Sequence, residues 1–128
     1  MGQLDFRGTV FSGSGTGKDF VELPWVRAQI EQKLGFTPYP GTLNLRLTKA
    51  ETVKRRILDP PCGIWVKPEV GYFFGVFFRA IVLDVEAAVV IPLVPSYPVD
   101  VLEVVAPLYL RGKLGKGDGD VVVVTVTV

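Results

Sequence analysis

The sequence predicts one mainly β domain with short helices, spanning residues 1–128. Hydrophobic residues make up 48% of the chain and charged residues 21%, which is typical of a folded globular protein. Several short segments alternate apolar and polar residues, the pattern of half-buried strands. A length of 128 residues is enough for one hydrophobic core and too short for two.

Composition narrows the classes of function. The net charge is +1, with 14 basic and 13 acidic residues, which argues against binding to duplex DNA. The chain has no histidine, so catalysis has to rest on carboxylates, lysine, backbone amides or a hard cation. Cys62 is the one cysteine, which excludes an internal disulfide and fits a reducing, cytoplasmic compartment. No signal peptide is recognised at the N-terminus, and Arg79 and Asp84 interrupt the apolar stretch that could otherwise suggest a membrane span.

The first predicted strand covers residues 4–11 and leads into the glycine-rich sequence SGSGTGK at 12–18. Glycines at alternate positions disfavour a regular strand interior and allow backbone N–H groups to turn toward an anion. Lys18 would add a positive charge. The segment is not a Walker loop, because Ser12 and Asp19 stand where that motif needs glycine and a hydroxyl residue. A phosphate-binding loop and a flexible hairpin connection both fit this pattern.

A helix is expected to follow, with Pro24 in its first turn, an apolar stripe of Val26, Ile30 and Leu34, and Gly35 after its last turn. A second helix is predicted from the capping box at residues 48–51, with Val53 and Ile57 facing inward. The basic residues 54–56 would be its solvated side, or a small nucleic-acid patch.

Between these helices, residues 39–45 form a tight turn that runs straight into a strand. The leucines from Leu43 onward point to one face of this strand, and Thr42 and Asn44 point to the other. A hydroxyl and an amide oxygen two residues apart suit a Mg²⁺ whose other ligands are water and phosphate oxygens. The alternative is the polar outer face of an ordinary half-buried strand.

The second half of the chain is predicted to be mainly strand, at residues 63–67, 72–85, 87–94, 101–105 and 121–128. Apolar residues on both faces of 72–85 suggest a barrel strand covered outside by helices, with a bend or bulge at Gly75. Pro107 should open a helical turn in which Leu110 and Leu114 share a face, and residues 116–120 read as a turn, with metal binding there a weaker alternative.

Glu103 stands out because it is a carboxylate inside the apolar strand 101–105. Burying a carboxylate is costly unless it is paired or hydrogen-bonded. It could lie at an exposed edge, form a salt bridge to Arg79 or Arg111, or accept a hydrogen bond from a substrate.

Several separated segments resemble the archaeal CTP-dependent riboflavin kinases. They are GSGTGK at 13–18, LGFTPYPGTLNL at 34–45, LEVVAP at 102–107, the pair at 110–111, and DGDV at 118–121. The segments follow the order of that family and span nearly the whole chain. The resemblance implies a six-stranded cradle-loop barrel of the riboflavin-kinase type. It also implies transfer of the γ-phosphate of CTP to the 5′-hydroxyl of riboflavin, giving FMN and CDP.

The resemblance also implies roles for residues of this chain. Those expected to bind the nucleotide are Ser14, Gly15, Thr16, Gly17, Lys18, Asp19, Tyr109, Leu110, Arg111 and Gly112. Thr42 and Asn44 would hold Mg²⁺, Glu103 would contact the flavin, and Lys18 and Glu103 are the catalytic candidates. Family members tend to carry a Thr or Ser in the proline-rich loop that contacts the flavin. Here Pro95 takes that position, with Ser96 beside it.

This interpretation agrees with the residue inventory, because phosphoryl transfer depends mainly on positioning and charge neutralisation and needs no histidine. We expect a monomer whose partners are riboflavin and CTP, with no nucleic acid or membrane bound. Three alternatives stay open from sequence alone. They are a non-catalytic flavin- or nucleotide-binding barrel, a swapped-hairpin DNA-binding regulator, and an ATP-dependent flavin kinase of the bacterial type.

Overall fold

The computed structural model of the chain describes residues 2–13 and 15–128. Seven strands and four short α-helices are found in these residues, together with one turn of 3₁₀-helix. The strands are β1 (Gln3–Val10), β2 (Leu43–Leu47), β3 (Ile64–Val66), β4 (Gly75–Val82), β5 (Val85–Pro92), β6 (Val101–Val105) and β7 (Val121–Thr127). The helices are α1 (Thr16–Glu22), α2 (Pro24–Leu34), α3 (Lys49–Arg55) and α4 (Leu110–Leu114), with the 3₁₀ turn η1 at Pro60–Cys62. The longest helix has 11 residues, and a helix able to cross a bilayer is not found in the described part of the chain.

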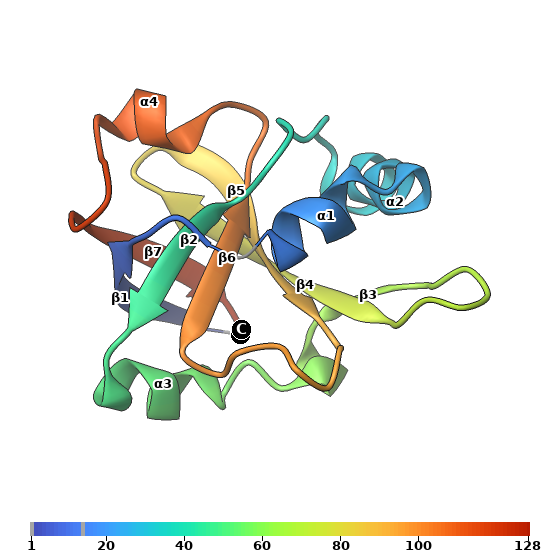
Figure 1. The fold of residues 1–128 in the computed structure, drawn as a ribbon, viewed down its shortest axis with the longest axis horizontal. Coiled ribbons are helices and arrows are strands. Elements are labelled where there is room, and N and C mark those ends of the chain that lie inside the picture. The colour runs from blue at the N-terminus through green and yellow to red at the C-terminus, as the bar shows by residue number, and fades with distance from the viewer. Residues whose placement is uncertain (1, 14) are drawn as a thin grey trace.

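Six of the strands close into an antiparallel barrel. The hydrogen-bonded order is β3-β4-β5-β6-β2-β1-β7, and β4 also pairs with β7, which joins the two ends of the six-stranded ring. The short strand β3 lies outside the ring, against β4. Figure 1 shows α1 and α2 to one side of the barrel and α3 and α4 at its two ends. The predicted mainly β fold with a six-stranded barrel is therefore confirmed. Closure also leaves β3 as the extra strand with a free edge.

The main core fills the barrel interior with one face of each strand. Phe6, Leu45, Phe78, Leu102 and Val124 are each fully buried there. In β2 the burial alternates as the sequence predicts, with the leucines inward and the polar residues outward. The outward side of β2 is consequently free to carry a site.

A second core lies between α1, α2 and the outer faces of β4, β5 and β6. Phe20 and Ile30 from the helices pack there with Phe77, Val90 and Val105 from the strands. The expectation that helices cover the outer face of the long apolar segment is confirmed. The α2 stripe is also confirmed, and Gly35 ends that helix in the left-handed region at φ 84°.

The long apolar segment begins its strand later than predicted. Residues 72–74 are exposed and belong to the β3–β4 connection, and β4 starts at Gly75. A Cβ at Gly75 would lie 2.5 Å from Cζ of Phe20. The glycine is thus required by the close packing of α1 and not by a bulge in the strand.

Helix α3 begins as predicted but has its faces reversed. The Thr48 hydroxyl accepts a hydrogen bond from the Glu51 N–H, so the predicted N-cap is confirmed. The predicted inward face is wrong, because the side chains of Val53 and Ile57 are 57% and 54% exposed. Lys54 and Arg55 turn inward instead, while Arg56 stays exposed. The Lys54 ammonium lies 5.2 Å from the centre of the Phe6 ring, and the Arg55 guanidinium lies 5.9 Å from that of Tyr97. The long aliphatic stems of these two residues cover the barrel end while their charges meet aromatic faces.

Candidate functional site

Asn44 and Glu103 lie side by side on the outer face of the barrel. They are register partners across β2 and β6, and Val90 of β5 is the next residue in the same row. Val90 is covered by the second core, whereas Asn44 borders open cavities. Glu103 therefore sits where the helix-covered part of the sheet gives way to its open part. Its side chain is only 3% exposed, which excludes the edge-strand alternative.

The buried carboxylate of Glu103 is held by hydrogen-bond donors and not by a salt bridge. The Tyr97 hydroxyl donates to Oε2 at 2.8 Å, and the backbone N–H of Gly17 lies close enough to the carboxylate to favour its charged form. Burial raises the pKa of Glu103, and these donors, with the nearby Thr42 hydroxyl, offset part of that rise. The two proposed salt-bridge partners are engaged elsewhere, since Arg79 donates to carbonyls of α2 and Arg111 pairs with Asp118.

Two glycines of the glycine-rich segment permit this arrangement by close approach. A Cβ at Gly13 would lie 2.7 Å from both Cγ and Oδ1 of Asn44. A Cβ at Gly17 would overlap the carboxylate of Glu103. The segment is only partly a loop, because α1 begins at Thr16 and Gly17 is buried within it. The two glycines thus allow the start of α1 to lie against Glu103 and the loop before it to lie against Asn44.

Two buried oxygens of β2 and its preceding turn lack a partner. In the described chain, Thr42 Oγ1 and Asn44 Oδ1 are buried and accept no hydrogen bond. The Thr42 hydroxyl lies close enough to Glu103 to favour its charged form, but outside ordinary hydrogen-bond geometry. Unsatisfied buried oxygens of this kind are ligands that Mg²⁺ accepts. No group of three or more Cys, Asp or Glu side chains suited to a metal is found among residues 2–13 and 15–128, so a cation there would rely on these neutral oxygens.

The first cavity lies on one side of Asn44 and has a volume of about 240 Å³. Its lining includes the backbone of Gly13 and Gly15, the side chain of Lys18, the turn before β2, and the start of α4. The rings of Tyr39 and Tyr109 lie at its border with their centres 5.5 Å apart and their planes inclined by 32°. This cavity joins a positive charge and backbone amides to a pair of half-exposed aromatic rings.

The second cavity lies on the other side of Asn44 and has a volume of about 300 Å³. It is lined by Phe11, Ser12, Gly13, Thr16, Asn44, Arg46, Tyr97, Pro98, Val101 and Glu103. The Arg46 guanidinium stacks over the Phe11 ring at 4.2 Å and pairs with Asp100 at 3.2 Å. Because Gly13 and Asn44 line both cavities, the two spaces meet at this pair of residues.

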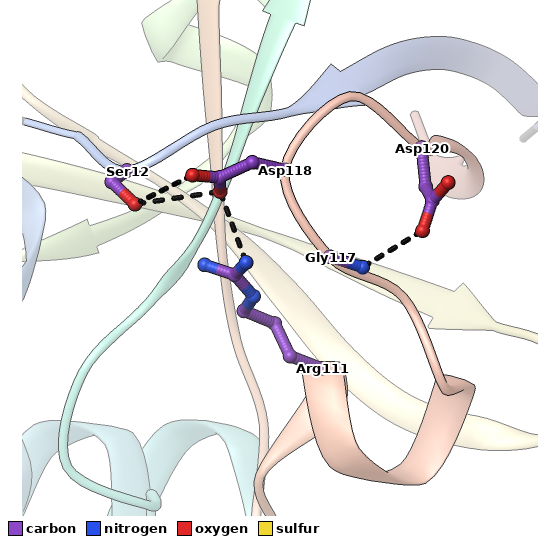
Figure 2. Close-up of polar contacts among 5 residues, drawn as sticks. All are labelled: Ser12, Arg111, Gly117, Asp118 and Asp120. Atoms are coloured by element: carbon purple, nitrogen blue, oxygen red, sulfur yellow. Dashed lines mark hydrogen bonds and ion pairs between the residues drawn. The ribbon is translucent and has the colours of Figure 1, made fainter.

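A polar cluster joins the segments around the first cavity. Figure 2 shows Asp118 accepting hydrogen bonds from Ser12 and from Arg111, at 3.1 Å and 2.9 Å. Asp120 accepts from the N–H of Gly117 at 2.8 Å, as expected for a turn. The predicted turn at 116–120 is therefore confirmed, and Asp118 links the start of the glycine-rich segment to α4.

The structure brings most of the predicted site residues to these two cavities. Gly15, Lys18, Tyr109, Leu110 and Arg111 line the first, Thr16 and Glu103 line the second, Thr42 lines the first and Asn44 lines both. Asp19 and Gly112 are exposed and line neither cavity. Gly17 is buried against the Glu103 carboxylate and also lines neither cavity. Ser14 lies outside the described residues.

The prediction that Pro95 and Ser96 of the proline-rich loop contact the flavin fits the structure least. Pro95 and Ser96 are exposed and line neither cavity, and the next residue, Tyr97, takes a place in the second cavity. Sequence reasoning also left out Phe11 and Arg46 as site residues, because each is an ordinary strand-end residue until the barrel closes. Tyr97 could have been found from one signal, namely that the buried Glu103 needed a donor from a nearby segment.

Comparisons with known proteins agree on one family. A family model with the short name CTP-dep_RFKase, described as "Domain of unknown function DUF120", matches residues 10–126. The riboflavin kinase of Archaeoglobus fulgidus is 45% identical over 132 residues, covering 98% of this chain and 55% of that protein. The riboflavin kinase of Ignicoccus hospitalis is 40% identical over 127 residues, covering 96% of this chain and 71% of that protein.

A third relative shows the same pattern of coverage. The riboflavin kinase of Pyrobaculum islandicum is 45% identical over 120 residues, covering 88% of this chain and 56% of that protein. The chain thus spans a little over half the length of the Archaeoglobus and Pyrobaculum relatives.

The Gly17–Glu103 contact predicts that Gly17→Ala destabilises the protein, whereas helix propensity alone predicts that it stabilises it. Gly→Ala inside a helix ordinarily stabilises a protein by about 1 kcal/mol. Gly17→Ala should instead lower the free energy of unfolding by about 1–3 kcal/mol, since the new methyl group displaces a buried carboxylate. Urea denaturation measures the change, with Gly2→Ala as the control because nothing lies within 4 Å of that position.

The same contact predicts coupling between the two residues. In a Glu103→Ala background the carboxylate is absent, so Gly17→Ala should cost much less or become stabilising. Equal effects of Gly17→Ala in both backgrounds would show that the glycine is needed for some other reason.

Proposed function

The chain belongs to the CTP-dependent riboflavin kinase family, and from this premise we propose that it transfers the γ-phosphate of CTP to the 5′-hydroxyl of riboflavin, giving FMN and CDP. The observation that carries the proposal is the meeting of two cavities at Gly13 and Asn44. Two substrates that exchange a phosphate need separate sites that share one boundary. The barrel supplies this arrangement at the Asn44–Glu103 row.

The first cavity suits the nucleotide. Lys18 and the backbone at Gly13 and Gly15 offer positive charge and N–H donors to a polyphosphate. Tyr39 and Tyr109 offer aromatic surface to a base, and the backbone at 109–111 offers hydrogen-bonding groups by which cytosine can be distinguished from larger bases. The cluster of Ser12, Asp118 and Arg111 ties the start of the glycine-rich segment to α4, and both of these segments border the cavity.

The second cavity suits riboflavin. It combines the Phe11 and Tyr97 rings with Glu103, so it offers apolar surface to a planar ring system and an acceptor to a donor group of the substrate. Glu103 is adjacent to Asn44 in the sheet, which places the acceptor next to the boundary between the cavities.

Thr42 and Asn44 would hold Mg²⁺ through the two oxygens that lack partners in the described chain. When bound, Mg²⁺ neutralises charge on the phosphate oxygens of the donor. The neutral oxygens of Thr42 and Asn44 would fit this use, because uncharged protein ligands would leave the charge of the cation available to the phosphates.

In the reaction, the 5′-oxygen of riboflavin forms a bond to the γ-phosphorus of CTP. The bond from that phosphorus to the β,γ-bridging oxygen breaks, and CDP leaves with the electron pair. The hydroxyl proton passes to solvent water as the new bond forms. Lys18 and the neighbouring backbone amides stabilise charge on the transferred group, while Asn44 and Glu103 hold the reacting ends at the cavity boundary.

We further propose that the chain acts as a single-domain monomer in the cytoplasm and binds neither nucleic acid nor a membrane. The near-neutral net charge of +1 supports the proposed absence of nucleic-acid binding. The inward turn of Lys54 and Arg55 also removes part of the basic cluster that a nucleic acid would contact.

A donor panel tests the proposed function. Riboflavin is incubated with each of the four nucleoside triphosphates and Mg²⁺, and FMN is measured by chromatography. We expect FMN with CTP and at least about tenfold less with the purine donors, since two hydrogen bonds lost at the base cost about this much. FMN formed best with ATP would support the bacterial-type donor, and riboflavin binding without FMN would support a non-catalytic barrel.

Removing either metal-binding oxygen should impair turnover more than folding. Asn44→Ala and Thr42→Ala should each lower kcat by about 10²-fold and raise the Mg²⁺ concentration needed for half-maximal rate. Thr125→Ala is the matched control, because Thr125 lies outside both cavities and bonds only Asp5. Unchanged Mg²⁺ dependence in both variants would remove these residues from the metal site.

A further inference from the structure

We propose that Tyr97 is the positioning residue of the flavin cavity, whose hydroxyl fixes the Glu103 carboxylate so that it accepts an N–H or O–H donor of the substrate. The inference rests on the proposed function and deepens it. It also gives a role to the first residue after the exposed turn at 95–96 that reaches the second cavity.

The loop geometry selects Tyr97. Residues 95 and 96 form an exposed turn that is closed by the Tyr97 N–H donating to the Val94 carbonyl at 3.1 Å. Pro95 has no side-chain donor, and neither it nor Ser96 reaches the second cavity. Tyr97 and Pro98 are the first residues after the turn to line that cavity. A long side chain after the turn thus reaches where a short one at the turn does not.

The contact with Glu103 is short and directed. The Tyr97 hydroxyl donates to Oε2 at 2.8 Å, the usual length of an O–H···O hydrogen bond. No Lys or Arg forms a salt bridge with Glu103 in the described chain. The orientation of this flexible carboxylate therefore depends on Tyr97 and on the N–H of Gly17.

The surroundings keep Tyr97 in place and keep its proton on the phenol. The Arg55 guanidinium of α3 lies 5.9 Å from the centre of the Tyr97 ring, in reach of a cation–π contact. Burial and the adjacent Glu103 raise the pKa of the Tyr97 hydroxyl, so it remains a donor at neutral pH. A carboxylate that receives the Tyr97 hydroxyl still has acceptor capacity left for a donor of the ligand.

Tyr97→Phe tests the inference, because it removes the hydroxyl and keeps the ring that lines the cavity. KM for riboflavin should rise about tenfold, as expected for losing one hydrogen bond to a charged group, while KM for CTP stays within about twofold. Tyr72→Phe is the matched control, since Tyr72 is exposed in the β3–β4 connection and lines neither cavity.

A double variant separates positioning from stability. If Tyr97 acts through Glu103, adding Tyr97→Phe to Glu103→Gln should change KM for riboflavin by less than about twofold. An unchanged KM in Tyr97→Phe, or effects of the two substitutions that multiply, would overturn the inference. A loss of stability with unchanged KM would show a structural role only and would overturn it as well.

Riboflavin binding, followed by quenching of flavin fluorescence, separates this inference from the proposed function. If the unmodified chain binds riboflavin and forms FMN, and the Tyr97→Phe variant binds riboflavin equally well, only the role of Tyr97 is contradicted. An unmodified chain that does not bind riboflavin would contradict the proposed function and, with it, the flavin cavity.

Discussion

The site depends on the close approach of the glycine-rich segment to the outer face of the barrel. Gly13 leaves room for Asn44, and Gly17 leaves room for Glu103 and brings its N–H close to that carboxylate. A side chain at either position would displace Asn44 or Glu103, or push α1 or its preceding loop away from the strands. Without this approach Glu103 would lose a donor, and the space beside Asn44 would not be divided into two cavities.

Barrel closure explains why residues far apart in the chain form one site. Asn44 and Glu103 become neighbours only because β2 pairs with β6, and the interior core holds that register through alternating leucines and valines. The outer face carries Asn44 and Glu103 side by side, with Glu103 buried next to α1 and Asn44 bordering the open cavities. A chain without histidine can support phosphoryl transfer in this setting, because neutral oxygens, one lysine and backbone amides can meet the needs of positioning and charge stabilisation.

Sequence reasoning recovered what local patterns determine. The β2 alternation, the α2 stripe, the Thr48 cap and the barrel class were all predictable, since each follows from spacing or from family resemblance. The α3 face was not, because Lys54 and Arg55 cover aromatic rings that only the folded barrel brings near. The roles of Gly17 and Tyr97 were also hidden, since both depend on contact with a residue far along the chain or across a turn. The glycine pattern suggested a phosphate loop, while the structure adds a steric reason that no spacing rule contains.

We propose that donor and acceptor occupy different cavities that meet at Asn44. A crystal structure of the chain with CDP, Mg²⁺ and FMN bound would locate both ligands. We expect CDP between Lys18 and the Tyr39–Tyr109 pair, the flavin against Tyr97 and Glu103, and the facing phosphates beside Asn44. Both ligands in one cavity, or phosphates that lie away from Asn44 and Thr42, would contradict it.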